Sequence, residues 1–325
     1  MTTRVASHAG SWYTSNGDKL QYQLEEYLKS VDIEETPVPG ARVIIAPHAG
    51  YSYSGETAAW AYKTLDLSNC KRVFLLGPSH AYYLSGCALS KHGKYATPLG
   101  DLVINKETVA ELQKTGKFDT MSEENDEAEH SLEMHLPYIY TMISQAFEDP
   151  FKYPTLVPIL VGNTNPRKEQ EFGRILAPYL ADPTSVFVIS SDFCHWGTRF
   201  SYTYYLPQAS IQERSSKGKS LARRDPRPTN PPIYDSINEL DKQVMDAIET
   251  GQHQTFLQNL SETENTVCGR HPIGVVMAAI EVLESEGKAS GTAYGKFKFV
   301  KYARSSEVED INDSSVSYAS AYAVI

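Results

Sequence analysis

Two histidines stand where apolar stretches of the sequence end. His48 closes ARVIIAPH (41–48) and His80 closes KRVFLLGPSH (71–80). The spacing between them fits one strand, one crossover helix and the next strand. Because a right-handed crossover returns the chain to the same edge of a sheet, we expect both imidazoles at neighbouring strand ends. Two imidazoles placed in this way begin a metal site.

A metal site needs a third ligand, and the sequence offers two. Asp192 follows the apolar run SVFVIS within 185–196 and would complete the two-histidine, one-carboxylate set of non-haem iron proteins. Cys268, in TVCGRHPIG just ahead of a predicted helix, would supply a thiolate instead. On the residues alone, Cys268 is more typical of a packed core thiol than of a ligand. His195 closes the same run as Asp192 and joins the candidate group.

The segment EAEHSLEMHLPY (127–138) adds further titratable side chains. His130 and Glu133 are spaced to share one helix face, whereas His130 and His135 would point apart. The pattern is not HExxH, so it does not indicate a zinc protease. Two interpretations stay open, a local capping network around Ser131 and an acid–base role for His130.

The elements that would position these residues alternate along the chain. Short apolar stretches followed by amphipathic ones are typical of βαβ units, in which near-continuous apolar strands are covered on both faces. We therefore predict a single-domain α/β fold over 1–325, with a largely parallel or mixed central sheet and helices on both of its faces. The predicted strands are 41–48, 71–80, 155–162, 185–196, 294–305 and 315–325, and the predicted helices are 56–67, 105–116, 166–181, 235–249 and 273–286.

Composition restricts the class of function. The chain has 325 residues, of which 41% are hydrophobic and 22% charged, and its formal net charge is −10. This acidic balance does not favour nucleic acid or anionic membranes as partners. With no long apolar run and no signal-peptide pattern, we expect a cytoplasmic protein, present also in the nucleus, without membrane insertion. The four cysteines lack CxxC spacing, so free thiols in a reducing compartment are expected.

Residues 207–232 interrupt the alternating pattern. The stretch PQASIQERSSKGKSLARRDPRPTNPP is polar, basic and rich in proline. Because it offers little apolar area to offset chain ordering, we predict a flexible surface insertion within the single domain. A basic docking patch is the alternative.

Two short segments resemble one another. His-Ala-Gly occurs at 8–10 before Trp12 and Tyr13, and again at 48–50 before Tyr51 and Tyr53. We expect two similar turns, each placing a histidine beside aromatic rings.

Eight motifs occur in order over nearly the whole chain: SHAGSWY (7–13), APHAGYSYSG (46–55), LGPSH (76–80), EHSLEMHLPY (129–138), PILVG (158–162), SSDFCHWG (190–197), CGRHPIG (268–274) and DSSVSYA (313–319). Taken together, they resemble the Memo family. This family is similar in fold to the LigB-type class III extradiol dioxygenases, which cleave catechol rings with non-haem Fe(II).

The resemblance implies a metal site of altered chemistry. The dioxygenases hold iron with two histidines and a glutamate. The matching positions here are His48, His80 and Cys268, with the cysteine standing where the glutamate would be. A thiolate is softer than a carboxylate, which favours copper or thiolate-tolerant iron and makes ring cleavage doubtful.

The resemblance also implies roles around the metal. His195 matches the acid–base position, with Asp192 close by and His130 in the outer site, while Trp12 and Tyr53 match aromatic residues of the pocket. Family members are linked to receptor signalling and cell motility, and the pocket is associated with a phosphotyrosine-bearing peptide. We therefore expect a redox-active copper or iron protein. A non-enzymatic module that binds a peptide or phosphopeptide is the alternative, and a ring-cleaving dioxygenase comes third.

Overall fold

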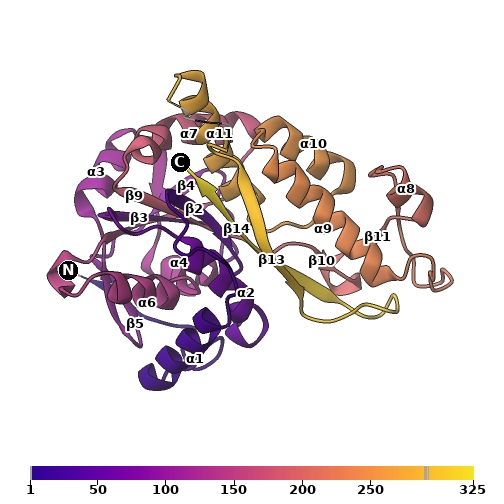
Figure 1. Ribbon diagram of the computed structural model, residues 1–325, viewed down its shortest axis with the longest axis horizontal. Coiled ribbons are helices and arrows are strands. Elements are labelled where there is room, and N and C mark those ends of the chain that lie inside the picture. The colour runs from indigo at the N-terminus through magenta and orange to yellow at the C-terminus, as the bar shows by residue number, and fades with distance from the viewer. Residues whose placement is uncertain (1, 289–290, 292) are drawn as a thin grey trace.

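One mixed sheet of nine strands organises the chain, and helices cover both of its faces (Figure 1). The computed structural model describes residues 2–288, 291 and 293–325. The sheet has the order β10-β14-β2-β9-β3-β8-β4-β7, with β13 paired to β14 outside this path. A three-stranded sheet (β1-β5-β6) and a two-stranded ribbon (β11-β12) complete the β-structure of the described residues.

The strands have the following bounds: β1 (Thr3–Arg4), β2 (Ala41–Ala46), β3 (Arg72–Pro78), β4 (Cys87–Leu89), β5 (Lys94–Thr97), β6 (Gly100–Val103), β7 (Phe118–Thr120), β8 (Thr155–Val161), β9 (Ser185–Ser190), β10 (His195–Trp196), β11 (Tyr204–Tyr205), β12 (Lys219–Ser220), β13 (Phe297–Arg304) and β14 (Ser315–Val324). The helices are α1 (Gly17–Lys29), α2 (Tyr51–Thr64), α3 (Lys106–Lys114), α4 (Glu123–Ala128), α5 (His130–Glu133), α6 (Leu136–Ala146), α7 (Pro166–Ala181), α8 (Gln208–Gln212), α9 (Ile233–Glu249), α10 (His253–Thr263) and α11 (Arg270–Ser285), with 3₁₀ turns η1 (Pro150–Lys152) and η2 (Thr198–Phe200).

Four parallel strands form the buried centre of the sheet. In β2 and β9 every residue is buried, and in β3 and β8 all but the first. A strand covered on both faces needs this near-continuous apolar sequence, because neither row of its side chains reaches water. The α/β class, the mixed sheet and the helices on both faces are confirmed.

The strand order differs from the sequence-based expectation in one respect. β2 and β3 are not neighbours, because β9 lies between them and pairs in parallel with both. The expectation of neighbouring strand ends for His48 and His80 was therefore wrong. Both histidines still follow the carboxyl ends of parallel strands, but the end of β9 separates them.

The helices that cover the central strands come from two groups. α2 packs on β2 and β14, while α7 and α11 pack on each other and on β3 and β9 on the opposite face. α2 begins at Tyr51 instead of residue 56 as predicted. The extra turn brings the start of α2 next to His48.

The N-terminal strand β1 is held by a buried cation. The Arg4 guanidinium is fully buried and donates to Glu133 at 2.7 Å and to Asp126 at 3.2 Å. A buried charge is tolerated only when it is paired and hydrogen-bonded, so these carboxylates fix the start of the chain against α4 and α5.

Residues 207–232 lie at the edge of the molecule and contain α8 and β12. β12 pairs with β11, and Leu221 is buried in a small hydrophobic cluster with Trp196 and Leu240. Most other side chains of the segment reach solvent. The flexibility predicted for this segment stays a prediction. Across the described chain, none of the helices is both long and apolar enough to cross a membrane.

Candidate metal centre

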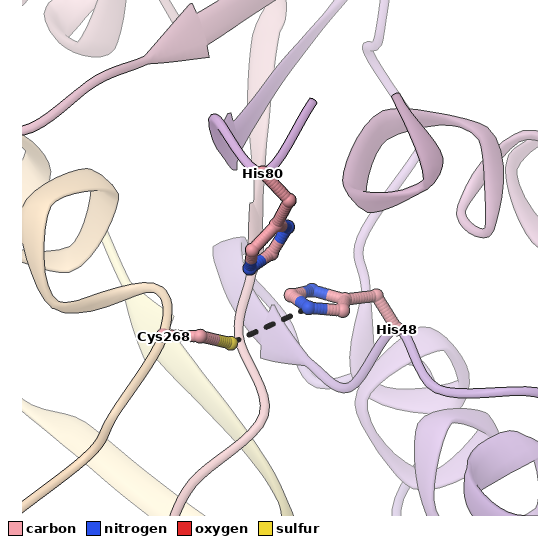
Figure 2. Close-up of side chains that lie close together, drawn as sticks. All are labelled: His48, His80 and Cys268. Atoms are coloured by element: carbon pink, nitrogen blue, oxygen red, sulfur yellow. Dashed lines mark hydrogen bonds between the residues drawn. The ribbon is translucent and has the colours of Figure 1, made fainter. Parts of the chain in front are cut away.

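Two imidazoles and one thiol meet at the carboxyl edge of the sheet (Figure 2). His48 follows β2, His80 follows β3, and Cys268 precedes α11. One ligand atom from each of the three lies within 4.8 Å of the others. The Sγ of Cys268 is 3.3 Å from Nε2 of His48. A tetrahedral ion with bonds of about 2.0–2.3 Å would hold two such atoms roughly 3.5 Å apart.

Hydrogen bonding fixes which nitrogen His48 presents to the centre. Its Nδ1 lies 2.6 Å from Oγ of Ser190 at the end of β9. That hydroxyl donates its own proton to the carbonyl of Ser131 at 2.7 Å, so it accepts from Nδ1–H. The lone pair of Nε2 is then free and faces Cys268, as a metal ligand requires. Burial, with the neighbouring imidazoles of His80 and His130, keeps the pKa of His48 well below its usual value, so the ring is neutral.

A buried carboxylate orients His80. Glu129 accepts from the main-chain N–H of His80 at 2.7 Å, and its other oxygen lies 3.4 Å from Nδ1 of that ring. Burial opposes ionisation of Glu129, but the His80 ring and the main chain of residues 80 and 131 lower the pKa of its carboxyl to about 2. An ionised carboxylate behind one nitrogen leaves the other, Nε2, for a metal.

The thiol of Cys268 is held by the turn that follows β9. Its Sγ accepts from the main-chain N–H of Asp192 at 3.2 Å. Burial, with the nearby charge of Asp192, raises the pKa of this thiol above its usual value. The metal-free group is thus protonated at neutral pH, and binding a metal would displace the proton. Two imidazoles and one displaceable thiol proton fit a metal of borderline to soft character.

The carboxylate of Asp192 lies outside this ligand group and supports its backbone. Its Oδ1 accepts from the main-chain N–H of His48 at 2.8 Å. Burial raises the pKa of Asp192 above its usual value. Three residues further on, Nδ1 of His195 lies 2.8 Å from the carbonyl of Phe193. That contact makes Nδ1 the protonated nitrogen and leaves Nε2 of His195 as a base.

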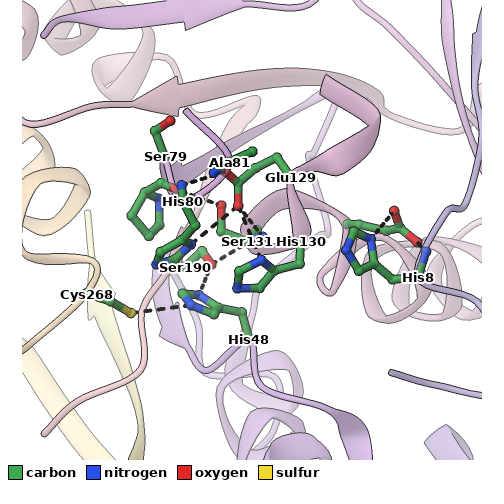
Figure 3. A network of polar contacts seen from close by, with 12 residues as sticks. His8, His48, Ser79, His80, Ala81, Glu129, His130, Ser131, Ser190 and Cys268 are labelled. Atoms are coloured by element: carbon green, nitrogen blue, oxygen red, sulfur yellow. Dashed lines mark hydrogen bonds and ion pairs between the residues drawn. The ribbon is translucent and has the colours of Figure 1, made fainter. Parts of the chain in front are cut away.

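Aromatic rings line the outer side of the cluster, where Figure 3 shows the imidazole of His130 next to those of His48 and His80. The ring of His130 stacks on His80 at 4.6 Å between centroids, and Trp12 lies 4.5 Å from His130 on its other side. Burial and the adjacent His80 lower the pKa of His130 to about 4, so this imidazole is neutral at physiological pH. Tyr53, in the first turn of α2, is 64% exposed and does not stack on the cluster.

The two His-Ala-Gly turns lie side by side. The main-chain N–H of Tyr51 donates to the carbonyl of Trp12 at 3.0 Å. In the first turn, His8 donates from its main-chain N–H to Glu133 at 2.8 Å, and its ring lies 6.0 Å from that of His130. The similar segments therefore place aromatic and imidazole rings around one site.

Sequence reasoning missed the residues that support the ligands. Glu129 and Ser190 orient His80 and His48, and Glu133 anchors the first turn through Tyr13 and His8. Glu129 stands immediately before α5 and accepts from the main-chain N–H of Ser131, but Glu is not among the residues that usually cap helices, so the sequence carried little signal of this role. The structure thus contains both a capping contact around Ser131 and His130 beside the candidate ligands, so the two interpretations of this segment do not exclude one another.

Fold and site define an α/β protein with a histidine–cysteine cluster at the carboxyl edge of a mixed sheet. A sequence profile of the family described as Memo-like protein matches residues 4–322. The chain is 48% identical over 316 residues to human Protein MEMO1, an alignment that covers 97% of this chain and 95% of the human protein. It is 43% identical over 318 residues to the Protein memo-1 homolog of Caenorhabditis elegans, covering 98% and 81%. The chain belongs to the Memo family.

A solved structure of an uncharacterized protein from Escherichia coli K12 aligns with a TM-score of 0.37 at 14% identity, over 85% of this chain and 98% of that one. The resemblance in fold to the LigB-type dioxygenases stays a prediction.

Proposed function

We propose that this Memo-family chain binds copper or iron through His48, His80 and Cys268, and that the site exchanges electrons. The supporting observation is the convergence of the three ligand atoms within 4.8 Å, with hydrogen bonds that aim Nε2 of His48 at the thiol. Imidazole and thiolate together suit copper and thiolate-tolerant iron. Such a metal would supply one-electron chemistry.

The residues of the chain divide the remaining work. Cys268 releases its proton when it becomes a ligand, and His195, whose Nδ1 faces the carbonyl of Phe193, presents Nε2 as the acid–base atom for a substrate proton. His130, neutral and stacked between His80 and Trp12, covers the outer side and provides a second acid–base group. Asp192 holds the main chain at His48. Because a thiolate stands in place of a carboxylate, we do not expect cleavage of catechol rings.

Metal titration of protein purified without an affinity tag tests this proposal. We expect one equivalent of Cu(I) or Fe(II) to bind, and Cys268→Ala or His48→Ala to weaken binding by at least about 100-fold. Cys70→Ala is the matched control, because Cys70 is a buried thiol just before β3, at the opposite end of that strand from His80. Equal affinity of wild type and Cys268→Ala for both metals would reject the site. Oxygen uptake by the metal-loaded protein tests the redox step. It is measured with ascorbate as the reductant and, in parallel, with a panel of catechols.

A second function is supported by the aromatic rim. Trp12 is 37% exposed and Tyr53 64% exposed. The guanidinium of Arg199 lies 4.4 Å over the ring of Phe200, which in turn packs against His195 at 5.2 Å. Exposed aromatic rings near a cation suit a peptide that carries a phosphorylated tyrosine, and such binding would place the chain in signalling or cell motility.

Fluorescence anisotropy with one peptide in its tyrosine and phosphotyrosine forms separates this function from the first. We expect tighter binding of the phosphorylated form, lost in Trp12→Ala and His195→Ala. Tyr22→Ala is the control, since Tyr22 is an aromatic residue as exposed as Tyr53 but lies on α1. Unchanged binding in Trp12→Ala would reject this function without affecting the metal proposal. For location we propose the cytoplasm and nucleus, supported by four unpaired thiols.

A further inference from the structure

A buried carboxylate joins three helices behind Cys268. Glu169 of α7 lies 2.6 Å from Nε2 of His253, the first residue of α10, and 2.7 Å from Nδ1 of His271 in the first turn of α11. Nε2 of His271 lies 3.1 Å from Oδ1 of Asn163, just beyond the end of β8. We call these four residues, Asn163, Glu169, His253 and His271, the Glu169 junction.

The junction carries a fixed charge inside the protein. Glu169 and His253 are almost wholly buried, with exposed fractions of 1% each. Burial opposes ionisation of Glu169, but the hydrogen bonds from His253 and His271 lower the pKa of its carboxyl below the usual value. A buried carboxylate that loses its hydrogen-bonding rings is left with an uncompensated charge. The four side chains therefore act as one unit.

Close packing restricts how α11 can move on α7. A side chain at Gly274 would overlap the carboxylate of Glu169, and a Cβ at Gly173 would lie 2.8 Å from that of Ala278. At Gly173 the two helices approach backbone to backbone, whereas Gly274 leaves room for the carboxylate of Glu169. Sliding or tilting α11 would break the contacts of His271 and Gly274 with Glu169 together.

The turn that leads into α11 carries the thiol. Cys268 stands three residues before His271 and two before Arg270, where the helix begins. Between them, the main-chain N–H of Gly269 donates to Oγ of Ser191 at 3.0 Å, just after β9. The turn is thus fastened on one side to the end of β9 and on the other to α7 and the end of β8. β8 is the neighbour of β3, which carries His80.

We propose that Glu169 and His271 are positioning residues, which hold the start of α11 so that Sγ of Cys268 faces the imidazoles of His48 and His80. This inference rests on the proposed metal site and extends it. The inference assigns a role to three residues of the segment CGRHPIG. Cys268 is the proposed ligand, His271 holds the start of α11, and Gly274 leaves space for the carboxylate of Glu169. It also relates the motif PILVG to the site, because Asn163, the residue after this motif, contacts His271.

Alkylation of Cys268 by iodoacetamide, in metal-free full-length protein, measures the position of this thiol directly. Peptide mapping by mass spectrometry distinguishes it from Cys70, Cys87 and Cys194, which are buried. In Glu169→Gln we expect Cys268 to react about tenfold faster than in wild type, because the first turn of α11 opens locally, while the other three stay unreactive. An unchanged rate at Cys268 in folded Glu169→Gln would overturn the proposal.

Asp126→Asn is the matched control. Asp126 is a buried carboxylate with several partners, among them Arg4 and Tyr95, and lies away from α11. We expect it to lower the free energy of unfolding without selective reaction of Cys268. If Asp126→Asn accelerates Cys268 as much as Glu169→Gln does, general destabilisation explains the effect and the inference is wrong.

His271→Gln decides the matter if Glu169→Gln unfolds and all four thiols react together. It removes the anchor on α11 and keeps the contact of Glu169 with His253. Selective acceleration at Cys268 supports positioning, and a wild-type rate overturns it. Co(II) loading then separates this inference from the proposed function. Absence of a sulfur-to-cobalt absorption band in wild type rejects the metal site, whereas a band that weakens in His271→Gln supports positioning.

Discussion

The hydroxyl of Ser190, which is not itself a proposed ligand, determines which nitrogen of His48 can face a metal. Ser190 accepts from Nδ1–H of His48 and donates to the carbonyl of Ser131, so its single proton is already committed. In Ser190→Ala the buried Nδ1–H has no acceptor, and the ring gains by placing its proton on Nε2. We therefore expect metal affinity to fall about 10–100-fold, the usual cost of losing a residue that orients a ligand.

Competition with a chelator measures this loss. Ser320→Ala serves as the control, because Ser320 is also a buried strand hydroxyl that donates to a carbonyl, that of Thr57, away from the ligands. Both variants should lose similar stability, but only Ser190→Ala should lose metal. Wild-type affinity in Ser190→Ala would show that the tautomer of His48 is set by something else.

At the scale of elements, the site depends on how closely α7 and α11 approach. A Cβ at Gly173 would lie 2.8 Å from Cβ of Ala278 and 2.9 Å from the main-chain nitrogen of Ala279. Neither neighbour can rotate away, so Gly173→Ala must push the helices apart. Overpacking of this kind costs about 1–3 kcal/mol, against a gain of about 1 kcal/mol in helix propensity.

We expect Gly173→Ala to lower the midpoint of urea unfolding by the equivalent of up to about 2 kcal/mol at unchanged slope. The comparison variant is Gly86→Ala, whose Cβ would meet only the ring of Phe172 at an ordinary 3.7 Å. A midpoint for Gly173→Ala at or above that of wild type would mean that the two helices are not in tight contact.

Elements also show how far the sequence could lead. The apolar strands and the histidines at their ends were predictable, because parallel strands buried on both faces leave a continuous apolar pattern. The insertion of β9 between β2 and β3 was not, since strand order depends on pairings between distant segments. Because β9 lies next to β2, Ser190 at the end of β9 is placed beside His48, and this contact was not predictable either. Cys268 was one of two possible third ligands on the residues alone, and only the family resemblance favoured it over Asp192, because nothing local distinguishes it from a core thiol.

Over the whole molecule, buried titratable groups make stability depend on pH. Burial lowers the pKa of His135 to about 3, and burial together with the adjacent His80 lowers that of His130 to about 4. In the unfolded chain both would titrate near 6.5. Because the unfolded state binds these protons first, stability should decline as the pH falls from about 6.5 towards 4. Urea midpoints between pH 7 and 4 measure this decline, and a flat profile would contradict it.

Buried carboxylates extend the decline to lower pH. Burial opposes ionisation of Glu133, but contacts with His8 and Arg4 lower the pKa of its carboxyl from 4.5 to about 2. Its folded pKa is depressed, so its contribution is complete above pH 4.5 and is lost as the pH falls towards 2. Removing the charge leaves Arg4 partly unpaired in the interior, which costs about 3–5 kcal/mol at neutral pH.

Glu133→Gln should therefore be much less stable than wild type at pH 7, and the two unfolding midpoints should converge below pH 4.5 as the wild-type carboxyl is protonated. Glu26→Gln is the control, because Glu26 pairs with Lys29 on the exposed face of α1 and its loss should change stability little at any pH. Parallel profiles for wild type and Glu133→Gln would show that this carboxylate adds no pH-dependent stability. Convergence would mean that loss of the Arg4–Glu133 pair limits the stability of the fold at low pH. The same pair anchors the His8 turn beside the proposed metal ligands.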